Sequence, residues 1–385
     1  MNYDVVIIGV GVVGSAVALG LAQQGHKIAI VDKSSVPPNS PRHLSVNKKS
    51  SAFLDSLGVW DAIKPSSMPY SRIQAWDREG TGKVEFSAQD IGESNLGFIV
   101  KEGDLQKYLI SSLEKLGVDI FWSKELVNIK DGGDLVEINL DDGKKIISSS
   151  LLGADGISSK VRELCDFQVK SWSYDQQAIV GQIDSSEKLD DVIRQSFTKY
   201  GPLALLPINS TQMTMIWSVD SENVKDLNEL EDDLFLEKLQ QEFGGKTRKL
   251  KFSSQRFTFP LKHLTAVGFA KGRIAILGDA AHHVHPLAGL GLNSGLGDAE
   301  SIVKLFGKFP AVKVETIFKQ YSNERLPINI GLAAAMELFK RGFGNQNIWL
   351  KTLRNLTFKF VDNQQEIKNT FVKLATTLRL LLLIF

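Results

Sequence analysis

The N-terminal end of the chain constrains the fold more than any other segment. A continuous apolar run from Tyr3 to Ile8 stops at a glycine-rich segment, Gly9 to Gly14, which reads GVGVVG. Val12 to Gln24 then carries apolar residues on one helical face, and Lys27 to Val31 is a second apolar run. This order predicts a buried strand, a helix and a second buried strand that lies parallel to the first.

The spacing of the three glycines is typical of a turn that binds a dinucleotide. Gly9 permits a tight turn, Gly11 leaves room for a diphosphate beside the backbone, and Gly14 lets the helix pack closely on the strand. The N-terminus of the helix offers free N–H groups to that diphosphate. Asp32, at the end of the second strand, can accept hydrogen bonds from ribose hydroxyls and would repel a 2′-phosphate. The segment therefore predicts FAD or NAD, and not NADP.

A second candidate segment lies late in the chain. Asp279 follows a short predicted strand, Arg273 to Leu277, at the strand end where α/β sheets bind ligands, and its carboxylate could hold a polyol hydroxyl. A glycine run, Gly289 to Asn293, then leads into a helix whose N–H groups would face the negative charge of a reduced flavin. Alone, the segment is as compatible with an ordinary strand-to-helix turn. Its pairing with the first segment favours a flavin.

A third segment, GADGISSKVR, runs from Gly153 to Arg162. Asp155 follows a predicted strand, Ser158 could cap a short helix, and Arg162 could pair with a phosphate or with Asp155. Taken by itself, this pattern favours a capped turn with a structural ion pair over a cofactor contact.

Composition narrows the class of protein further. The 385 residues are enough for two domains, and a net charge of +1 gives no reason to expect a nucleic acid partner. The single cysteine, Cys165, excludes an intrachain disulfide and a cysteine-rich metal site. The first apolar run is too short for a signal peptide, which favours a cytoplasmic protein. No metal site is predicted around His282, His283 and His285, because two of them are adjacent and no cysteine is near.

The rest of the chain alternates between strand-like and helical patterns. Antiparallel strands are predicted over Arg72 to Glu85 and in a hairpin of Val127 to Leu140 with Lys144 to Leu152. Helices are predicted over Ser45 to Leu57 and Leu105 to Leu116, and residues from Cys165 to Phe259 are strand-like. The chain past Asn293 is mainly helical, and its apolar end, Leu378 to Phe385, is expected to dock on the core rather than to contact a membrane.

Together these patterns predict an α/β fold, in which a Rossmann-like FAD-binding domain carries an inserted, mostly antiparallel β-sheet substrate domain and C-terminal helices. The expected FAD-binding domain comprises residues 1–70, 98–164 and 262–330. The expected substrate domain comprises residues 71–97 and 165–261, and residues 331–385 form the C-terminal helical region. Trp172 and Trp217 could line a substrate cavity, although aromatic residues on strands more often belong to the core.

The three segments, in this order, resemble the single-component FAD-dependent aromatic hydroxylases, the para-hydroxybenzoate hydroxylase superfamily. The likeness is strongest to the branch of ubiquinone-biosynthesis hydroxylases. The matching stretches are DVVIIGVGVVGSAVALGLAQQGHKIAIVDK, GADGISSKVR and AILGDAAHHVHPLAGLGLNSGLGDAES. Weaker matches are Arg42 ahead of LDSLGVW, Gln106 in GFIVKEGDLQKYL, and LRN at residues 353–355. The resemblance covers nearly the whole chain and is least specific from about 165 to 260.

The resemblance implies roles for particular residues. It implies that Arg42 and Gln106 hold the cofactor, that Asp155 serves both FAD and NAD(P)H, and that Asp279 binds the ribityl chain. His282 and Pro286 are expected near the flavin ring, with no protein side chain assigned a catalytic role. The complete predicted cofactor-binding set is Gly9, Gly11, Val12, Val13, Gly14, Asp32, Lys33, Arg42, Gln106, Asp155, Asp279, Pro286, Gly289, Gly291, Leu292 and Asn293.

The resemblance also implies a reaction: NAD(P)H reduces FAD, O2 is consumed, and an aromatic ring is hydroxylated. The expected substrate is a lipophilic phenol, a ubiquinone precursor met at the inner face of the membrane or in a complex of pathway proteins. An oligomer is compatible with the sequence. Leu290 departs from the family, which usually has Gln between these two glycines. Two alternatives therefore stay open, a flavin reductase or dehydrogenase that does not use oxygen, and a non-catalytic flavoprotein scaffold.

Overall fold

The predicted strand–helix–strand unit is present in the computed structural model, which describes residues 2–35, 40–244, 249–283, 290–309 and 311–344. It consists of β1 (Asn2–Ile8), α1 (Val12–Gln23) and β2 (Ile28–Val31). β1 and β2 are parallel, with Val5 opposite Ile28, and every residue of β2 is buried. Burial on both faces explains why these strands are continuous apolar runs.

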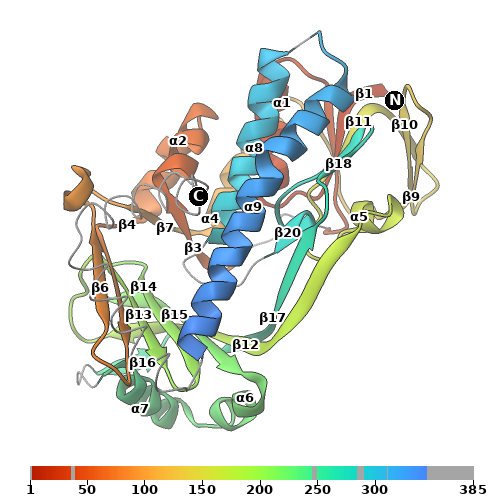
Figure 1. Ribbon diagram of the computed structural model, residues 1–385. Coiled ribbons are helices and arrows are strands. Elements are labelled where there is room, and N and C mark those ends of the chain that lie inside the picture. The colour runs from red at the N-terminus through yellow and green to blue at the C-terminus, as the bar shows by residue number, and fades with distance from the viewer. Residues whose placement is uncertain (1, 36–39, 245–248, 284–289, 310, 345–385) are drawn as a thin grey trace.

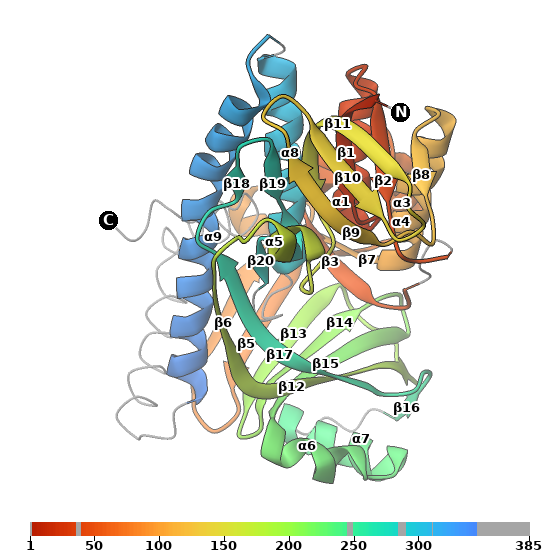
Figure 2. The ribbon, with the colours of Figure 1, turned by 90° about the vertical axis from the view of Figure 1, so that its right-hand side faces the viewer.

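β1 lies inside a mostly parallel sheet, in the upper part of Figure 1, and the strand order β18-β19-β11-β1-β2-β8 can be followed in Figure 2. Its further strands are β8 (Asp119–Phe121), β11 (Lys145–Gly153), β18 (Ala270–Lys271) and β19 (Ile274–Ile276). The predicted hairpin is confirmed, since β10 (Val136–Leu140) pairs antiparallel with β11 and β9 (Leu126–Asp131) pairs with β10. On one face, α4 (Glu102–Lys115) and α8 (Leu290–Lys308) pack against α1. The β9–β10 hairpin and α5 (Lys160–Leu164) lie on the other (Figure 2).

A second, largely antiparallel sheet lies below the first, with the order β20-β17-β12-β15-β14-β13-β5-β6 (Figure 2). Its strands are β5 (Arg72–Asp77), β6 (Lys83–Ser87), β12 (Val169–Ser185), β13 (Val192–Thr198), β14 (Gly201–Pro207), β15 (Gln212–Asp220), β17 (Phe257–Ala266) and β20 (His282–His283), with β16 (Leu250–Phe252) beside β12. The long strands β12 and β17 rise from this sheet toward α5, so the two sheets are joined through them. The predicted fold class is confirmed, whereas the domain boundaries stay a prediction.

The segment from Cys165 to Phe259 was predicted to be strand-like throughout, and that prediction is wrong in its second half. α6 (Ser221–Asn228) and α7 (Asp232–Phe243) cover the lower face of the second sheet. The reason is visible in α7, where Phe235, Leu236 and Leu239 follow the helical period and are all buried.

The predicted helix from Ser45 to Leu57 is also wrong at its start. Residues His43–Asn47 form β3, which pairs with β7 (Gly97–Lys101), and β4 (Met68–Tyr70) completes this small sheet. The helix α2 begins only at Lys48, because the Asn47 side chain caps it by accepting a hydrogen bond from Ser50 N–H at 2.9 Å.

The last described element is the long helix α9 (Val314–Gly344), which packs against α8 and then runs down beside the second sheet (Figure 1). The apolar end, Leu378 to Phe385, lies outside the described residues. Among the helices that the structure describes, none is long and apolar enough to cross a membrane.

Candidate active site

The three glycines of the first segment have three different environments. Gly9 has φ +105°, a left-handed value that favours glycine. A Cβ atom on Gly14 would lie 2.0 Å from the Gly9 carbonyl oxygen, so Gly14 is required for packing. A Cβ atom on Gly11 would have no atom of the described residues within 4 Å. The fold itself therefore does not require glycine at position 11. A ligand that approaches the backbone closely at this position would require it.

Asp32 and Gln106 meet at Val10, between the first two glycines. Asp32 Oδ2 accepts the Val10 N–H at 2.7 Å, and Gln106 Nε2 donates to the Val10 carbonyl at 2.9 Å. Ser15 Oγ donates to the same carbonyl at 2.8 Å. The sequence did not indicate Ser15, although a hydroxyl in the first turn of a helix often bonds to nearby backbone. These contacts fix the glycine turn before any ligand binds.

The second segment packs directly on the first. A Cβ atom on Gly278 would lie 3.4 Å from Val13 Cγ1, and one on Gly295 in α8 would lie 2.7 Å from Val13 Cγ2. The predicted site residue Val13 therefore fills the space between the two glycine-containing segments. Asp279 follows Gly278 at the carboxyl end of β19.

The Asp279 carboxylate is accessible and ionised. Its side chain is 46% exposed and accepts a hydrogen bond from His283 Nδ1 at 3.0 Å. Burial alone would raise the pKa of Asp279, but the hydrogen bond and charge of His283 and the positive fields of His282 and Arg42 lower it. A carboxylate in this state is suited to accept hydrogen bonds from hydroxyl groups.

The third segment is tied to both of the others. A Cβ atom on Gly9 would lie 2.4 Å from the Ala154 carbonyl oxygen, and Arg162 Nη1 donates to the Ala280 carbonyl at 3.0 Å. Asp155 Oδ2 accepts the N–H groups of Lys160 and Val161, so this carboxylate caps α5. The sequence placed the serine cap of α5 one residue too early. Ser159, and not Ser158, caps it by accepting the Arg162 N–H at 3.0 Å.

The start of α8 is anchored to β3. Asn293 is buried, its Oδ1 accepts the Asn47 N–H at 2.9 Å, and its Nδ2 donates to the Ser45 carbonyl at 2.8 Å. Leu290, the first residue of the helix, is also buried. Gly291 and Leu292 lie in the first helical turn, whose N–H groups have no partner within the helix. Pro286 and Gly289 lie outside the described residues.

Arg42 is held by an acidic residue at the start of α4. Its guanidinium donates to both carboxylate oxygens of Glu102, at 2.8 and 2.7 Å, while the side chain remains 58% exposed. Burial lowers the pKa of Arg42, but Glu102 and the charge of Asp279 raise it overall. Arg42 thus lies within the electrostatic reach of Asp279. Lys33, next to Asp32, is exposed.

The sequence did not indicate a buried ionic cluster that contacts the turn around Asp279. Asp298 in α8 is fully buried and contacts His282 Nε2 at 2.5 Å and Arg325 Nε at 2.6 Å. His282 is 1% exposed, and its contact with Asp298 joins the end of the turn to α8. Among the residues that the structure describes, no group of three or more His, Cys, Asp or Glu side chains is arranged to hold a metal ion.

The second sheet presents aromatic side chains toward the β3 side of the molecule. Gln182 of β12 donates to the Pro41 carbonyl at 3.2 Å, so this face of β12 looks toward β3. Val180 lies on the same face, two residues earlier, and its cross-strand neighbour is Phe257. Phe259 and His263 continue along β17, and His263 stacks on Trp172 at 3.8 Å between ring centroids. We call Trp172, Phe257 and Phe259 the aromatic stripe. Their exposed fractions are 42%, 54% and 37%.

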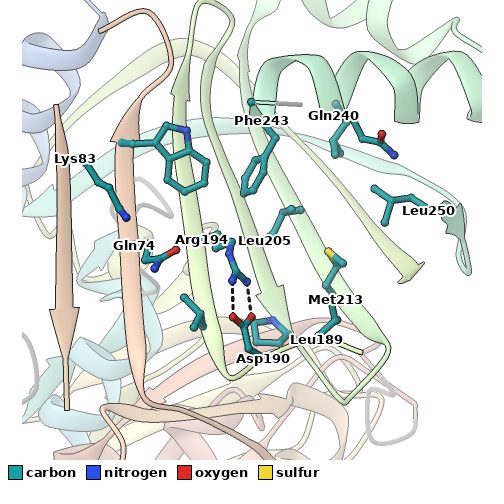
Figure 3. Close-up of a pocket in the computed structure, with 15 residues that line it drawn as sticks. Gln74, Lys83, Leu189, Asp190, Arg194, Leu205, Met213, Gln240, Phe243 and Leu250 are labelled. Carbon is teal, nitrogen blue, oxygen red and sulfur yellow. Dashed lines mark hydrogen bonds and ion pairs between the residues drawn. The ribbon is translucent and has the colours of Figure 1, made fainter. Parts of the chain in front are cut away.

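The cavity in Figure 3 lies on the opposite face of the same sheet. Thr214 contacts His43 of β3 at 3.4 Å, so the adjacent Met213 points away from that side. Met213 lines a cavity of about 380 Å³ with Leu239 and Phe243 of α7, and an Arg194–Asp190 ion pair closes one wall (Figure 3). This cavity is therefore separated from the glycine turn by the sheet. Trp217, expected as a cavity or core residue, is fully buried in the core beneath α7.

These features fit a dinucleotide cofactor. The glycine turn is open at Gly11, carboxylates stand at the ends of β2 and β19, and the first turn of α8 begins beside them. Asp155 Oδ1 is buried and has no hydrogen-bond partner among the described residues, which is unfavourable unless a further donor joins it.

Comparison with known proteins supports this assignment. A family model described as the FAD binding domain matches residues 2–336. The chain is 28% identical to a 3-demethoxyubiquinol 3-hydroxylase of Escherichia coli, over 97% of this chain and 98% of that protein. It is also 28% identical to a mitochondrial ubiquinone biosynthesis monooxygenase of Xenopus tropicalis, over 97% of this chain and 93% of that protein.

Solved structures share the fold. The p-nitrophenol 4-monooxygenase of Pseudomonas putida superimposes with a TM-score of 0.79 at 17% identity, over 98% of each chain. A probable FAD-dependent monooxygenase of Pseudomonas aeruginosa gives a TM-score of 0.81 at 19% identity, over 94% of this chain and 100% of the other. The chain therefore belongs to the FAD-binding-domain family and is a flavin-dependent monooxygenase of the aromatic hydroxylase type that its sequence resembles.

Proposed function

We propose that this monooxygenase hydroxylates the ring of a polyprenylated phenol, a precursor of ubiquinone, at a site between the glycine turn and the aromatic stripe. The main support for the cofactor site is that three segments distant in sequence meet there. The contacts that join them are those of Gly9 with Ala154, of Val13 with Gly278, and of Arg162 with Ala280. The relatives that are named for ubiquinone biosynthesis support the choice of substrate class.

In this proposal the chain grips both halves of FAD. Asp32 would accept the ribose hydroxyls of the adenosine half, and the N–H groups at the start of α1 would bind the diphosphate. Asp279 would accept hydroxyl groups of the ribityl chain, since its carboxylate is accessible and kept ionised by His283 and Arg42. Gln106 would act through Val10, whose carbonyl it already holds. Bound FAD, once reduced by NAD(P)H, supplies the reaction with O2 that hydroxylates the ring.

The protein contributes position and exclusion of water. The first turn of α8 would place N–H dipoles toward the flavin ring, and Asn293 holds that turn against β3. Leu290, which stands where the family usually has Gln, is buried at the start of the helix. Its apolar side chain therefore packs among protein atoms. The backbone N–H groups of this turn remain the same whichever side chain stands at position 290.

The aromatic stripe supports a lipophilic substrate. Trp172, Phe257 and Phe259 expose apolar surface on the sheet face that looks toward β3. Soluble proteins seldom expose several large apolar side chains side by side without using them for binding. An isoprenoid tail lying along the stripe would remove this surface from water and would leave the phenol ring at the flavin end.

A substrate of this kind resides in a membrane, and we infer that the protein works at the membrane surface without spanning it. Flotation of the purified protein with anionic phospholipid vesicles, with and without a tailed phenol, tests this inference. We expect the protein to float with the vesicles. Its recovery only in the unbound fraction under both conditions would contradict the inference.

The substrate proposal is tested with two phenols that share one ring and differ only in an isoprenoid tail. The FAD-loaded protein is given NAD(P)H and ¹⁸O₂, and the label in the product is measured by mass spectrometry. We expect one labelled oxygen atom on the ring, with a higher kcat/KM for the tailed phenol. NAD(P)H oxidation that gives only hydrogen peroxide with both phenols would overturn the proposal in favour of a flavin enzyme that does not hydroxylate.

A further inference from the structure

Asp298 is the carboxylate on which three separate elements converge. It lies in the apolar helix α8 and is fully buried, so an unpaired charge here would be strongly unfavourable. Its Oδ1 accepts Arg325 Nε at 2.6 Å, and its Oδ2 accepts the Gly278 N–H at 3.0 Å and contacts His282 Nε2 at 2.5 Å. Burial alone would raise the pKa of Asp298, but His282 and Arg325 lower it, so the group stays ionised.

Two of these partners bracket the turn that carries Asp279. Gly278 begins the turn, and His282 follows it at the start of β20. One carboxylate oxygen therefore fastens both ends of a short segment whose middle presents Asp279 to the proposed cofactor site. A shift of that oxygen would move both anchors together.

The third partner belongs to α9. Arg325 is locked in its position, because Nη2 also donates to the Ser294 carbonyl at 3.0 Å and a Cβ atom on Gly297 would lie 2.9 Å from this guanidinium. Tyr321, one turn earlier in α9, donates to the Ile276 carbonyl at 2.9 Å, at the end of β19. The position of α9 against the first sheet, which we call its seating, is thus connected to the turn through Asp298.

We propose that Asp298 is a positioning residue that fixes the turn Gly278–His283 against the cofactor and makes the geometry of this turn depend on the seating of α9. The inference rests on the proposed cofactor site insofar as it assigns this turn to FAD. Because α9 runs on from this site beside the second sheet, contacts made by α9 are transmitted to the cofactor side of the molecule through Arg325 and Asp298.

A simpler explanation is that any ion pair that holds α9 in place would affect FAD binding in the same way. The chain contains a second ion pair of α9 that can serve as a control for this explanation. Arg273, next to β19, pairs with Glu315 near the start of α9 at 2.9 Å. This pair also ties α9 to the first sheet, but within the part of the chain that the structure describes neither side chain bonds to the turn. Arg273→Met therefore loosens α9 without removing an anchor of Asp279.

The experiment compares FAD binding to the apoproteins of Asp298→Asn, Arg325→Met, His282→Ala, His282→Gln and the control Arg273→Met. Affinity is followed by flavin fluorescence, the shape of the flavin absorption bands is recorded, and Tm is measured for each apoprotein. Loss of a charge-assisted anchor should weaken FAD binding by about tenfold or more in the first three variants. His282→Gln should recover most of the affinity, because a Gln amide can place an N–H near the position of Nε2.

The control should lower Tm and leave the FAD affinity within about twofold of the wild type. The proposal is overturned if Asp298→Asn and His282→Ala fold and bind FAD like the wild type with unchanged bands. It is equally overturned if Arg273→Met weakens FAD binding as much as Asp298→Asn does. If Asp298→Asn fails to fold, the difference in FAD affinity between His282→Ala and His282→Gln still tests the proposal.

Asp279→Asn separates this inference from the proposed site. Weakened FAD binding in Asp279→Asn together with wild-type binding in Asp298→Asn would leave the site intact and refute the positioning role. Wild-type binding in Asp279→Asn together with weakened binding in Asp298→Asn would support positioning through the backbone of the turn and refute the assignment of Asp279.

Discussion

The Asp32 carboxylate accepts a 2.7 Å hydrogen bond from the backbone N–H of Val10, which stands between the first two glycines of the turn. Asp32 also accepts the Ser34 N–H at 2.8 Å through its other oxygen. A carboxylate has about four acceptor positions, so about two remain for ribose hydroxyls. The same side chain thus shapes the turn and, in the proposed function, would also bind the ribose of the cofactor.

This double role predicts that Asp32→Asn weakens FAD binding by about tenfold to a hundredfold, because the amide replaces one acceptor oxygen by a donor. Asp119 provides a control, since it accepts the Tyr3 hydroxyl at 2.7 Å on the neighbouring strand β8. Asp119→Asn should bind FAD like the wild type. Equal affinities of the Asp32 and Asp119 variants, measured by fluorescence titration, would argue against a ribose contact at Asp32.

The glycines at positions 11 and 14 should respond differently to the same added methyl group. Gly14→Ala should lower the free energy of unfolding of the apoprotein by about 1–3 kcal/mol, the usual cost of overpacking, because its Cβ meets the Gly9 carbonyl. Gly11→Ala should change apoprotein stability by less than about 1 kcal/mol, since open space surrounds its Cβ.

Gly11→Ala should therefore affect FAD binding and not the stability of the apoprotein. We expect its FAD affinity to fall by about tenfold or more, which corresponds to about 1.4 kcal/mol of lost binding free energy. Urea unfolding and FAD titration of both variants check the pair of predictions. A Gly11→Ala protein that binds FAD with wild-type affinity would show that no diphosphate passes over this residue.

Asp298 should give the protein an acid-sensitive stability. His282 and Arg325 face this carboxylate, and Tyr321 lies close by. Burial raises the pKa of Asp298, but the charges and hydrogen bonds of His282 and Arg325 lower it to about 2. A carboxyl group with a lowered pKa in the folded state stabilises the protein above its unfolded-state pKa of about 4, and this stability is lost as the pH falls toward about 2.

The expected loss is about 2 kcal/mol between pH 4 and pH 2, from a shift of about two pKa units. Asp298→Asn should be less stable than the wild type at pH 7, and the difference should shrink as the pH falls. Urea unfolding at a series of pH values measures this difference. A constant difference across the series would contradict the assignment of a lowered pKa to Asp298.

The aromatic stripe should affect only substrates that carry a tail. Phe257→Ala removes a side chain that is 54% exposed, so the fold should tolerate the change. We expect KM for a tailed phenol to rise by about threefold to tenfold, with KM for the tail-free phenol unchanged. Leu234 on α7, also 54% exposed, is the matched control, and Leu234→Ala should leave both values unchanged.

Much of the cofactor end of the molecule could be predicted from the sequence because each part is local. The glycine turn, its flanking strands and Asp32 lie within one continuous segment, and the apolar pattern reports burial on both faces of the strands. The hairpin between β10 and β11 was likewise evident from a turn sequence flanked by alternating residues.

The missed features depend on contacts between distant residues. Asp298 reads as an ordinary polar residue of a helix, and nothing local reveals that Arg325 and His282 will meet it. β3 was predicted as helix because Ser45 to Asn47 carry no strong strand signal, and its partner, β7, lies far along the chain. The pairing of Glu102 with Arg42 likewise joins two parts of the chain that are distant in sequence.

The claim that this chain holds a dinucleotide across its three segments is tested most directly by titrating the apoprotein with FAD and, separately, with FMN. FMN carries the flavin and ribityl chain but lacks the adenosine half that Asp32 and the start of α1 would bind. We expect saturable binding of one FAD per chain and binding of FMN that is weaker by about a hundredfold or more. Absence of FAD binding, or equal affinity for FAD and FMN, would contradict the claim.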